Sequence, residues 1–275
     1  MAFETNSPFD LTNMVVNTKA ATVYAAHESS LFLSGEIVPV SNIPAGSNIL
    51  QVPVLDGGST TTINATTALA GEQDIPVSLV TDDNSVNITA DIYAARTVLR
   101  DLGGIDPVDL GRQLGNKVSA SWDAAVAAVL ETAGIQDEAV TLASMSLTDI
   151  FNAVAAVRAG GESGQLYGVL GTTMAASLMG VAMAGNNVAG SQYGAEALRQ
   201  GFVGQIGGVN MFQSSAMTAT KGCIFSKDAF RIGMYKNVDL EIARRTASVG
   251  NDIVASLHAG VGMVDASRAV TLIGS

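Results

Sequence analysis

The chain has 275 residues, of which 48% are hydrophobic and only 14% are charged, and its formal net charge at pH 7 is −11. So acidic a chain is a poor nonspecific binder of nucleic acid, because the phosphate backbone attracts basic surfaces. Its mean hydropathy of +0.33 is high for a soluble monomer, which favours a protein that hides apolar surface against other subunits. The lone cysteine, Cys223, excludes an intrachain disulfide and is expected to be a small core residue.

The acidic residues are concentrated in the first third of the chain. Ten acidic residues and one base, Lys19, precede Arg96, whereas acids and bases nearly balance from Arg96 onward. Six of the bases lie close together near the C-terminus: Lys221, Lys227, Arg231, Lys236, Arg244 and Arg245. This asymmetry has two readings. Either an acidic extended segment faces a neighbour's basic patch, or the charges solvate an otherwise apolar surface.

Residues 1–30 are mostly polar and are expected to form an extended arm that includes at most a short helix over residues 19–31. They have no basic start and no apolar run, so we expect no secretory signal. Strand character follows over residues 48–54, 75–79 and 86–92, with a Gly/Thr-rich turn over residues 56–62. Two strands joined by so long a tip predict a protruding hairpin, which cannot be stabilised by its own burial.

The clearest predicted helix covers residues 107–132. Asp106 suits the N-cap and Pro107 the first helical position. Apolar residues recur at spacings of three and four, so one face is expected to be buried with Trp122 as its anchor. Gly111 and Gly115 each cost about 1 kcal/mol in a helix interior, which indicates that another backbone passes close to them.

The second half of the chain alternates helices and strands. A helix after Ser146, with Asp149 completing a capping box, is expected to bury Ile150, Phe151, Val154 and Val157. The next predicted elements are a strand at 166–170, a helix at 172–183, a helical turn at 194–200, and two strands within 201–215 hinged by Gly207 and Gly208. Strands at 238–243, 253–264 and 269–273 follow, around a short helix at 226–231. Glycines and hydroxyl residues interrupt the uncharged stretch between Glu162 and Glu196, so no membrane span is expected.

Catalytic chemistry has little support in this sequence. His27 and His258 are the only histidines and neither has partners spaced for a metal site. The glycines at 201, 204, 207 and 208 superficially resemble a dinucleotide-binding loop, but Gly207 and Gly208 lie between two strands and no helix follows to present its N-terminus to a phosphate. Asp82 and Asp83 are adjacent and would point to opposite faces of a strand. We therefore expect no catalytic, cofactor-binding or metal-binding residues.

The order of these elements resembles the major capsid protein of tailed bacteriophages, the Hong Kong ninety-seven phage fold that encapsulins also use. The resemblance covers nearly the whole chain. It rests on the run Ile49-Leu50-Gln51-Val52-Pro53 before the hairpin, on Tyr167-Gly168-Val169-Leu170, and on a glycine-patterned stretch ending in serine. That stretch matches the family pattern through Gly201, Val203, Gly204, Ile206, Gly208 and Met211.

The resemblance implies an α+β fold with four parts. These are an N-terminal arm at 1–30, a peripheral domain with a long spine helix at 31–51, 81–139 and 236–275, an extended β-hairpin (E-loop) at 52–80, and an axial domain at 140–235. The tail from Val238 is expected to complete the peripheral sheet. The residues expected to shape this fold are Asp106, Pro107, Trp122, Gly201, Gly204 and Gly208.

The function implied is self-assembly, through hexamers and pentamers, into the icosahedral head shell around the double-stranded DNA of a tailed bacteriophage. The expected location is the virion, after assembly in the bacterial cytoplasm, with no cofactor, no membrane and no sequence-specific DNA binding. The expected partners are further copies of the chain, a separate scaffolding protein, a portal and a decoration protein. Between neighbouring subunits, the E-loop acids Asp56, Glu72 and Asp74 are expected to pair with Arg244 and Arg245.

Three alternatives stay open at the level of sequence. An encapsulin shell would have the same fold but package a protein. A surface-layer or secreted β-rich structural protein would explain the Thr/Gly/Ala-rich first third, but the capped internal helices disfavour it. An enzyme would rest on His258 and the glycines alone.

One departure from the family leads to a prediction. The family prototype cross-links its subunits through an E-loop lysine, but this chain has no lysine between Lys19 and Lys117. That cross-link cannot form, so particles boiled in detergent are expected to run on a denaturing gel as one band near 28.1 kDa. A ladder of covalent oligomers would contradict this.

Overall fold

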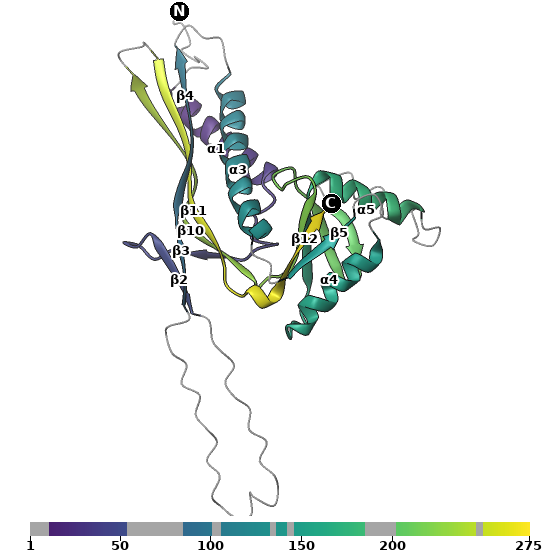
Figure 1. The fold of residues 1–275 in the computed structure, drawn as a ribbon. Helices are drawn as coiled ribbons and strands as arrows, with labels where there is room; N and C mark the ends of the chain where they lie inside the picture. The colour runs from purple at the N-terminus through teal and green to yellow at the C-terminus, as the bar shows by residue number, and fades with distance from the viewer. Residues whose placement is uncertain are drawn as a thin grey trace, which may run out of the picture.

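The computed structural model of the chain describes residues 11–53, 85–100, 106–132, 136–141, 146–184, 202–245 and 250–275. Within these ranges the fold is α+β, with two main sheets (Figure 1). The larger apolar core includes residues of both sheets, and the smaller one lies on the other face of the six-stranded sheet. The helices are α1 (Leu11–Ser29), α3 (Pro107–Thr132), α4 (Leu147–Ala159) and α5 (Thr172–Ala184). The strands of the first half are β1 (Val40–Asn42), β2 (Ile49–Pro53), β3 (Ser85–Thr89), β4 (Asp91–Arg100) and β5 (Gln136–Val140). Those of the second half are β6 (Leu166–Leu170), β7 (Phe202–Ile206), β8 (Val209–Gln213), β9 (Lys221–Ser226), β10 (Phe230–Arg245), β11 (Gly250–Met263) and β12 (Ala269–Gly274).

A four-stranded sheet in the order β1-β10-β11-β4 forms the elongated part of the molecule, and α3 lies along one of its faces (Figure 1). Alternate residues of β11 are buried under the helix, among them Ile253, Ala255 and Leu257. This period of two is that of a sheet with one covered face. Trp122 of α3 is fully buried and meets the ring of Tyr93 from β4 edge-on, with ring centroids 5.3 Å apart.

The predicted start and buried face of α3 are confirmed. The Asp106 carboxylate accepts a hydrogen bond from the backbone N–H of Val108 at 2.9 Å, as an N-cap residue does, and the helix begins at Pro107. Leu114, Val118 and Trp122 are each at most 4% exposed. The residues with the expected spacing therefore hold α3 against the sheet.

The reading of residues 1–30 as an extended arm is wrong for residues 11–29, which form α1 and pack against α3. A Cβ on Gly111 would lie 2.7 Å from the carbonyl oxygen of Thr18, and one on Gly115 would overlap that of Thr22. The close backbone inferred from these glycines is thus present, and it belongs to α1. The buried side of α1 carries small residues, Thr18, Thr22, Ala25 and Ala26, which give only a weak apolar pattern in the sequence.

A glycine-to-alanine pair tests this helix contact. Gly115→Ala is expected to lower the free energy of unfolding by about 1–3 kcal/mol, because the clash with a rigid backbone outweighs the gain in helix propensity. The matched control is Gly180→Ala in α5, where nothing lies within 4 Å of the added Cβ, so a gain of up to about 1 kcal/mol is expected. Urea unfolding of both variants measures the difference, and equal effects would show that α1 does not press on α3.

The second sheet has six strands in the order β5-β12-β9-β6-β8-β7, with α4 and α5 packed against its core. The strand pair predicted around Gly207 and Gly208 is confirmed as the β7–β8 hairpin. Both glycines have positive φ, 60° and 82°, as the two-residue turn of a tight hairpin requires. Gly204 has φ 127° at an irregularity in β7, where a side chain would be strained. Gly201 lies outside the described residues.

Three sequence expectations are corrected. The short helix at 226–231 is instead the end of β9, a turn and the start of β10. The tail completes the four-stranded sheet through β10 and β11, but β12 joins the six-stranded sheet between β5 and β9. Phe151 of α4 is 49% exposed, and its ring lies beside Gly207 rather than in the core. The strand expected at 75–79 and the helical turn at 194–200 lie outside the described residues.

Candidate assembly surfaces

The base of the hairpin rests on the four-stranded sheet. β2 pairs with β3 in antiparallel register from Ile49 opposite Thr89 to Pro53 opposite Ser85. Ile88 is buried and lies over Gly260 and Gly262 of β11, where an added Cβ would clash. Because these glycines have no side chain, the hairpin base can pack closely on the sheet. Asp56, Glu72 and Asp74 of the E-loop lie outside the described residues.

The paired arginines lie at the opposite end of the same sheet. β10 begins beside β1, where Ile232 pairs with Val40, and its last residues are Arg244 and Arg245 opposite Asn251 and Gly250. The side chain of Arg244 is exposed. Figure 1 shows β10 and β11 running from the hairpin base to this far end. Such separation suits a head-to-tail contact, in which one end of a subunit meets the other end of the next.

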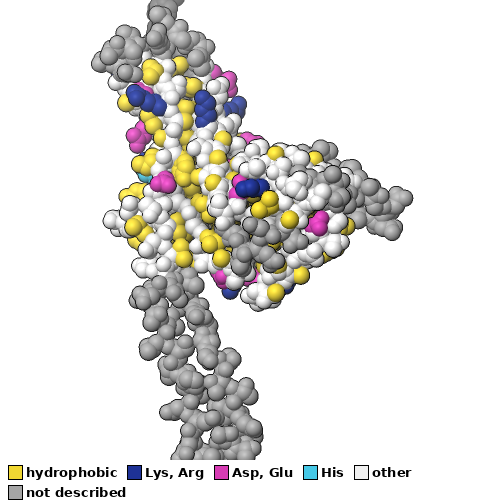
Figure 2. Space-filling view, viewed as in Figure 1, with side chains coloured by type: hydrophobic (Ala, Val, Ile, Leu, Met, Phe, Trp, Pro, Cys, Tyr) yellow, Lys and Arg dark blue, Asp and Glu magenta, His cyan; other side chains and the backbone are white. Residues whose placement is uncertain are grey.

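The face of the four-stranded sheet turned away from α3 carries exposed apolar side chains. Ile92 is 68% exposed, Tyr235 is 51% exposed and Val98 is 36% exposed. Figure 2 shows hydrophobic side chains gathered along this elongated part of the molecule. His258, the histidine considered for catalysis, stacks on the ring of Tyr235 with centroids 6.2 Å apart. Exposed apolar groups of this size are typical of surfaces that contact other proteins.

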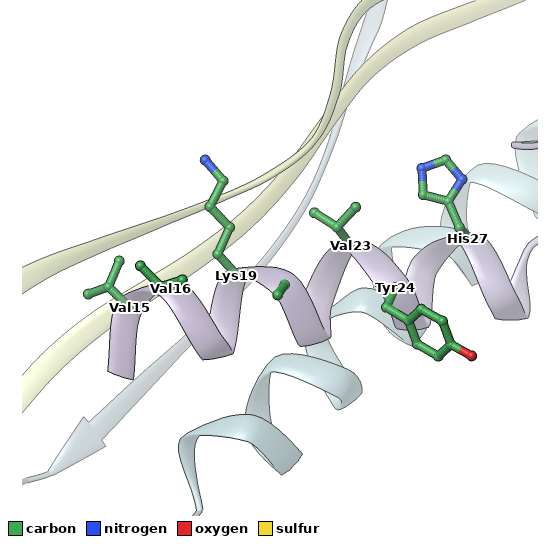
Figure 3. A pocket seen from close by; sticks show the side chains of 7 residues that line it. Val15, Val16, Lys19, Val23, Tyr24 and His27 are labelled. Atoms are coloured by element: carbon green, nitrogen blue, oxygen red, sulfur yellow. The ribbon is translucent and has the colours of Figure 1, made fainter. Parts of the chain in front are cut away.

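A second apolar surface lies on α1, and the sequence reasoning did not find it. An open groove of about 610 Å³ is lined by Val15, Val16, Lys19, Ala20, Val23, Tyr24 and His27. Figure 3 shows Lys19, Val23 and His27 pointing to one side of the helix and Tyr24 to the other. Tyr24 is 66% exposed and Val16 is 61% exposed. The roughly seven-residue spacing of the valines could have indicated an apolar helix face. It was not used, because these residues were expected to form an extended arm.

Ion pairs and hydrogen bonds join α1 to β10 beside this groove. The Lys19 ammonium pairs with Asp239, which also binds the Lys236 ammonium at 2.9 Å. Hydrogen bonds from Lys19 and Lys236 lower the pKa of Asp239 to about 2, so this carboxylate is ionised at neutral pH. Asn237 Nδ2 lies 3.4 Å from His27 Nε2. These polar contacts hold the groove-bearing helix on the edge of the sheet.

The described parts of the chain contain no group of three or more His, Cys, Asp or Glu residues placed to hold a metal ion. None of the helices in these parts combines the length and apolar character needed to cross a bilayer. Cys223 is buried, and burial raises the pKa of its thiol, which disfavours a reactive thiolate.

Comparisons with known proteins identify the fold by structure rather than by sequence. No family model matches the chain, and no curated protein sequence matches it. The virus-like particle from Pyrococcus furiosus matches with a TM-score of 0.65 at 12% identity, over 94% of this chain and 98% of that chain. The capsid of Cyanophage P-SCSP1u gives a TM-score of 0.65 at 17% identity, over 90% and 89%. The mature capsid of bacteriophage PhiM1 gives 0.63 at 13% identity, over 89% and 87%. The chain therefore has the phage capsid fold, and that prediction is confirmed.

Proposed function

We propose that this protein is a major capsid protein that self-assembles into the head shell of a tailed bacteriophage and encloses its double-stranded DNA. The observation that carries the proposal is the fold itself, which matches capsid structures over about nine tenths of both chains. The matched proteins are named as capsids, and the match extends over most of this chain. No catalytic role is proposed.

The surfaces of the subunit support the same proposal. Apolar side chains are exposed on α1 and on the face of the four-stranded sheet turned away from α3. They include Ile92, Tyr235, Val16 and Tyr24. A monomer would leave these groups in water, whereas a closed shell buries such surfaces repeatedly through symmetry. The hairpin base and the arginine end lie at opposite ends of one sheet, which suits rings of subunits such as hexamers and pentamers.

The finer features of the proposal concern partners and location. We propose that a scaffolding protein guides assembly, that a portal and a decoration protein complete the head, and that assembly takes place in the bacterial cytoplasm. The net charge of −11 supports a shell that encloses DNA without binding it tightly, because an acidic chain repels the phosphate backbone. Of the domain limits given above, the E-loop at 52–80 and an axial domain built on the six-stranded sheet are part of this proposal, whereas residues 11–29 form a helix and β12 belongs to the six-stranded sheet.

A second candidate function is a nanocompartment shell that packages a protein. It is supported by the match to the Pyrococcus furiosus virus-like particle over 98% of that chain, because the name of that protein describes a particle and not a virus. The contents of the particles distinguish the two functions. Particles purified from the source organism are treated with nuclease and then opened. We expect protected DNA of uniform length, and a stoichiometric second protein without DNA would favour the nanocompartment instead.

A further inference from the structure

Two chain segments connect the two sheets within the described residues, and they lie against each other. Residues 227–229 lead from β9 of the six-stranded sheet to β10 of the four-stranded sheet, and residues 264–268 lead back from β11 to β12. The carbonyl oxygen of Ala229 accepts hydrogen bonds from the backbone N–H groups of Val264 at 2.8 Å and Asp265 at 3.2 Å. Any change in the angle between the sheets must therefore act on both connections together.

Arg268 joins these connections to a third segment. Its guanidinium lies 2.9 Å from the Asp265 carboxylate and 3.4 Å from the Asp228 carboxylate, so it contacts both connecting segments. It also lies 3.1 Å from the carboxylate of Glu162, in the loop between α4 and β6. We call Glu162, Asp228, Asp265 and Arg268 the Arg268 cluster. A guanidinium suits this position because its planar fork can bond several carboxylates at once.

The Glu162 end of the cluster is anchored in the six-stranded half of the molecule. Its side chain is only 10% exposed, and it accepts hydrogen bonds from the Gly164 N–H at 2.6 Å and the Ser226 hydroxyl at 2.9 Å. These hydrogen bonds and the charge of Arg268 lower the pKa of Glu162, so the carboxylate is ionised at neutral pH. The residue after α4, Gly160, packs closely against the second connecting segment, because a Cβ on Gly160 would overlap the carbonyl oxygen of Ser267.

The charges of the cluster make Arg268 its essential member. One cation here faces three carboxylates, and the Glu162 carboxylate has little access to water. Without the cation, the carboxylates repel one another and a poorly hydrated charge is left without its partner, which is much costlier than losing an exposed ion pair. Repulsion between the Glu162 carboxylate and the carboxylates of the two connecting segments would push the loop between α4 and β6 away from those segments.

We propose that Arg268 holds the angle between the two sheets, by tying both connecting segments to the loop between α4 and β6. The inference rests on contacts within one subunit and does not depend on the proposed function. If the chain also builds a shell in which the two sheets contact different neighbours, the angle held by the Arg268 cluster sets the curvature between neighbouring subunits.

The distance between one spin label on each half of the unassembled full-length subunit tests this role. Exposed positions are available at Ala94 of β4 and Gln205 of β7, and the labels are attached through Ala94→Cys and Gln205→Cys. Cys223 is fully buried and stays unlabelled. Pulsed electron paramagnetic resonance is expected to give a narrow distance distribution for the doubly labelled chain that keeps Arg268. We expect Arg268→Gln to broaden it at least twofold, and Arg268→Lys to broaden it less.

Controls separate this effect from general loosening. Arg112→Gln removes an arginine of α3 whose side chain is 61% exposed and which pairs only loosely with Asp109, and it is expected to leave the distribution unchanged. Circular dichroism checks that each variant is folded. If Arg268→Gln does not fold, Arg268→Lys, which keeps the positive charge but lacks the planar fork, is measured in its place, and it is also expected to broaden the distribution. A distribution as narrow as that of the native chain in the folded variant would overturn the proposal. Because no particles are needed, a failure of the chain to form shells would leave this result intact.

Discussion

Replacing both Arg244 and Arg245 by glutamate is expected to abolish shell formation while leaving the subunit folded. The two arginines end β10, and the side chain of Arg244 is exposed. Neither arginine is among the described residues of the two apolar cores. In the proposed head-to-tail contact they meet the acidic E-loop of a neighbour, which contains Asp56, Glu72 and Asp74 and no base. Reversing their charge turns attraction into repulsion at every copy of the contact. Because a shell contains many copies, the unfavourable free energies of these contacts add up. Light scattering and electron microscopy measure the loss of particles.

Two controls make this result specific. Arg112→Glu reverses an exposed arginine on α3 and is expected to leave particle yield unchanged. Adding Asp56→Lys, Glu72→Lys and Asp74→Lys to the double glutamate variant is expected to restore particles, because the charges are then complementary again with their signs exchanged. Normal particles from the double glutamate variant would reject the pairing. Absence of rescue would leave the arginines as interface residues but remove the E-loop acids as their partners.

Trp122→Ala is expected to have the largest effect on the stability of the subunit, a loss of about 3–5 kcal/mol in the free energy of unfolding. The indole is fully buried between α3 and the four-stranded sheet and contacts the ring of Tyr93. Its removal leaves a cavity at the centre of the larger core, which the surrounding helix and sheet can fill only in part. Urea unfolding followed by circular dichroism measures the loss.

Trp122→Phe is the matched control. The indole nitrogen of Trp122 has no hydrogen-bond partner among the described residues, so phenylalanine keeps most of the apolar volume and removes an unsatisfied N–H. We expect it to cost less than half as much as alanine. Equal losses for the two variants would mean that ring volume is not what stabilises this position.

The order of elements was predictable from sequence because its signals are local. Asp106 and Pro107 mark the start of α3, and Gly207 and Gly208 mark the tight turn of the β7–β8 hairpin. The partner of β12 was not predictable in the same way, because strand pairing joins residues far apart in the chain. The resemblance implies that β12 completes the peripheral sheet with β10 and β11, yet β12 pairs with β5 and β9.

The candidate surfaces were predicted less well, for reasons that α1 illustrates. Its contact with α3 uses small residues and two glycines of the partner helix, so the helix lacks the strong apolar stripe that sequence reading depends on. The glycines nevertheless revealed that a backbone was close. Phe151 shows the opposite error, since it follows the buried Ile150 in the sequence but points away from the core. The Arg268 cluster draws on three separate segments and carries no sequence motif.

Electron microscopy of the purified full-length chain tests the central claim most directly. The protein is concentrated in moderate salt, stained and imaged, and its mass distribution is followed in parallel by light scattering. The proposal predicts closed isometric particles of uniform size, or rings of five or six subunits where a scaffolding protein is needed to close the shell. A chain that stays monomeric at every concentration, with neither particles nor rings, would contradict it.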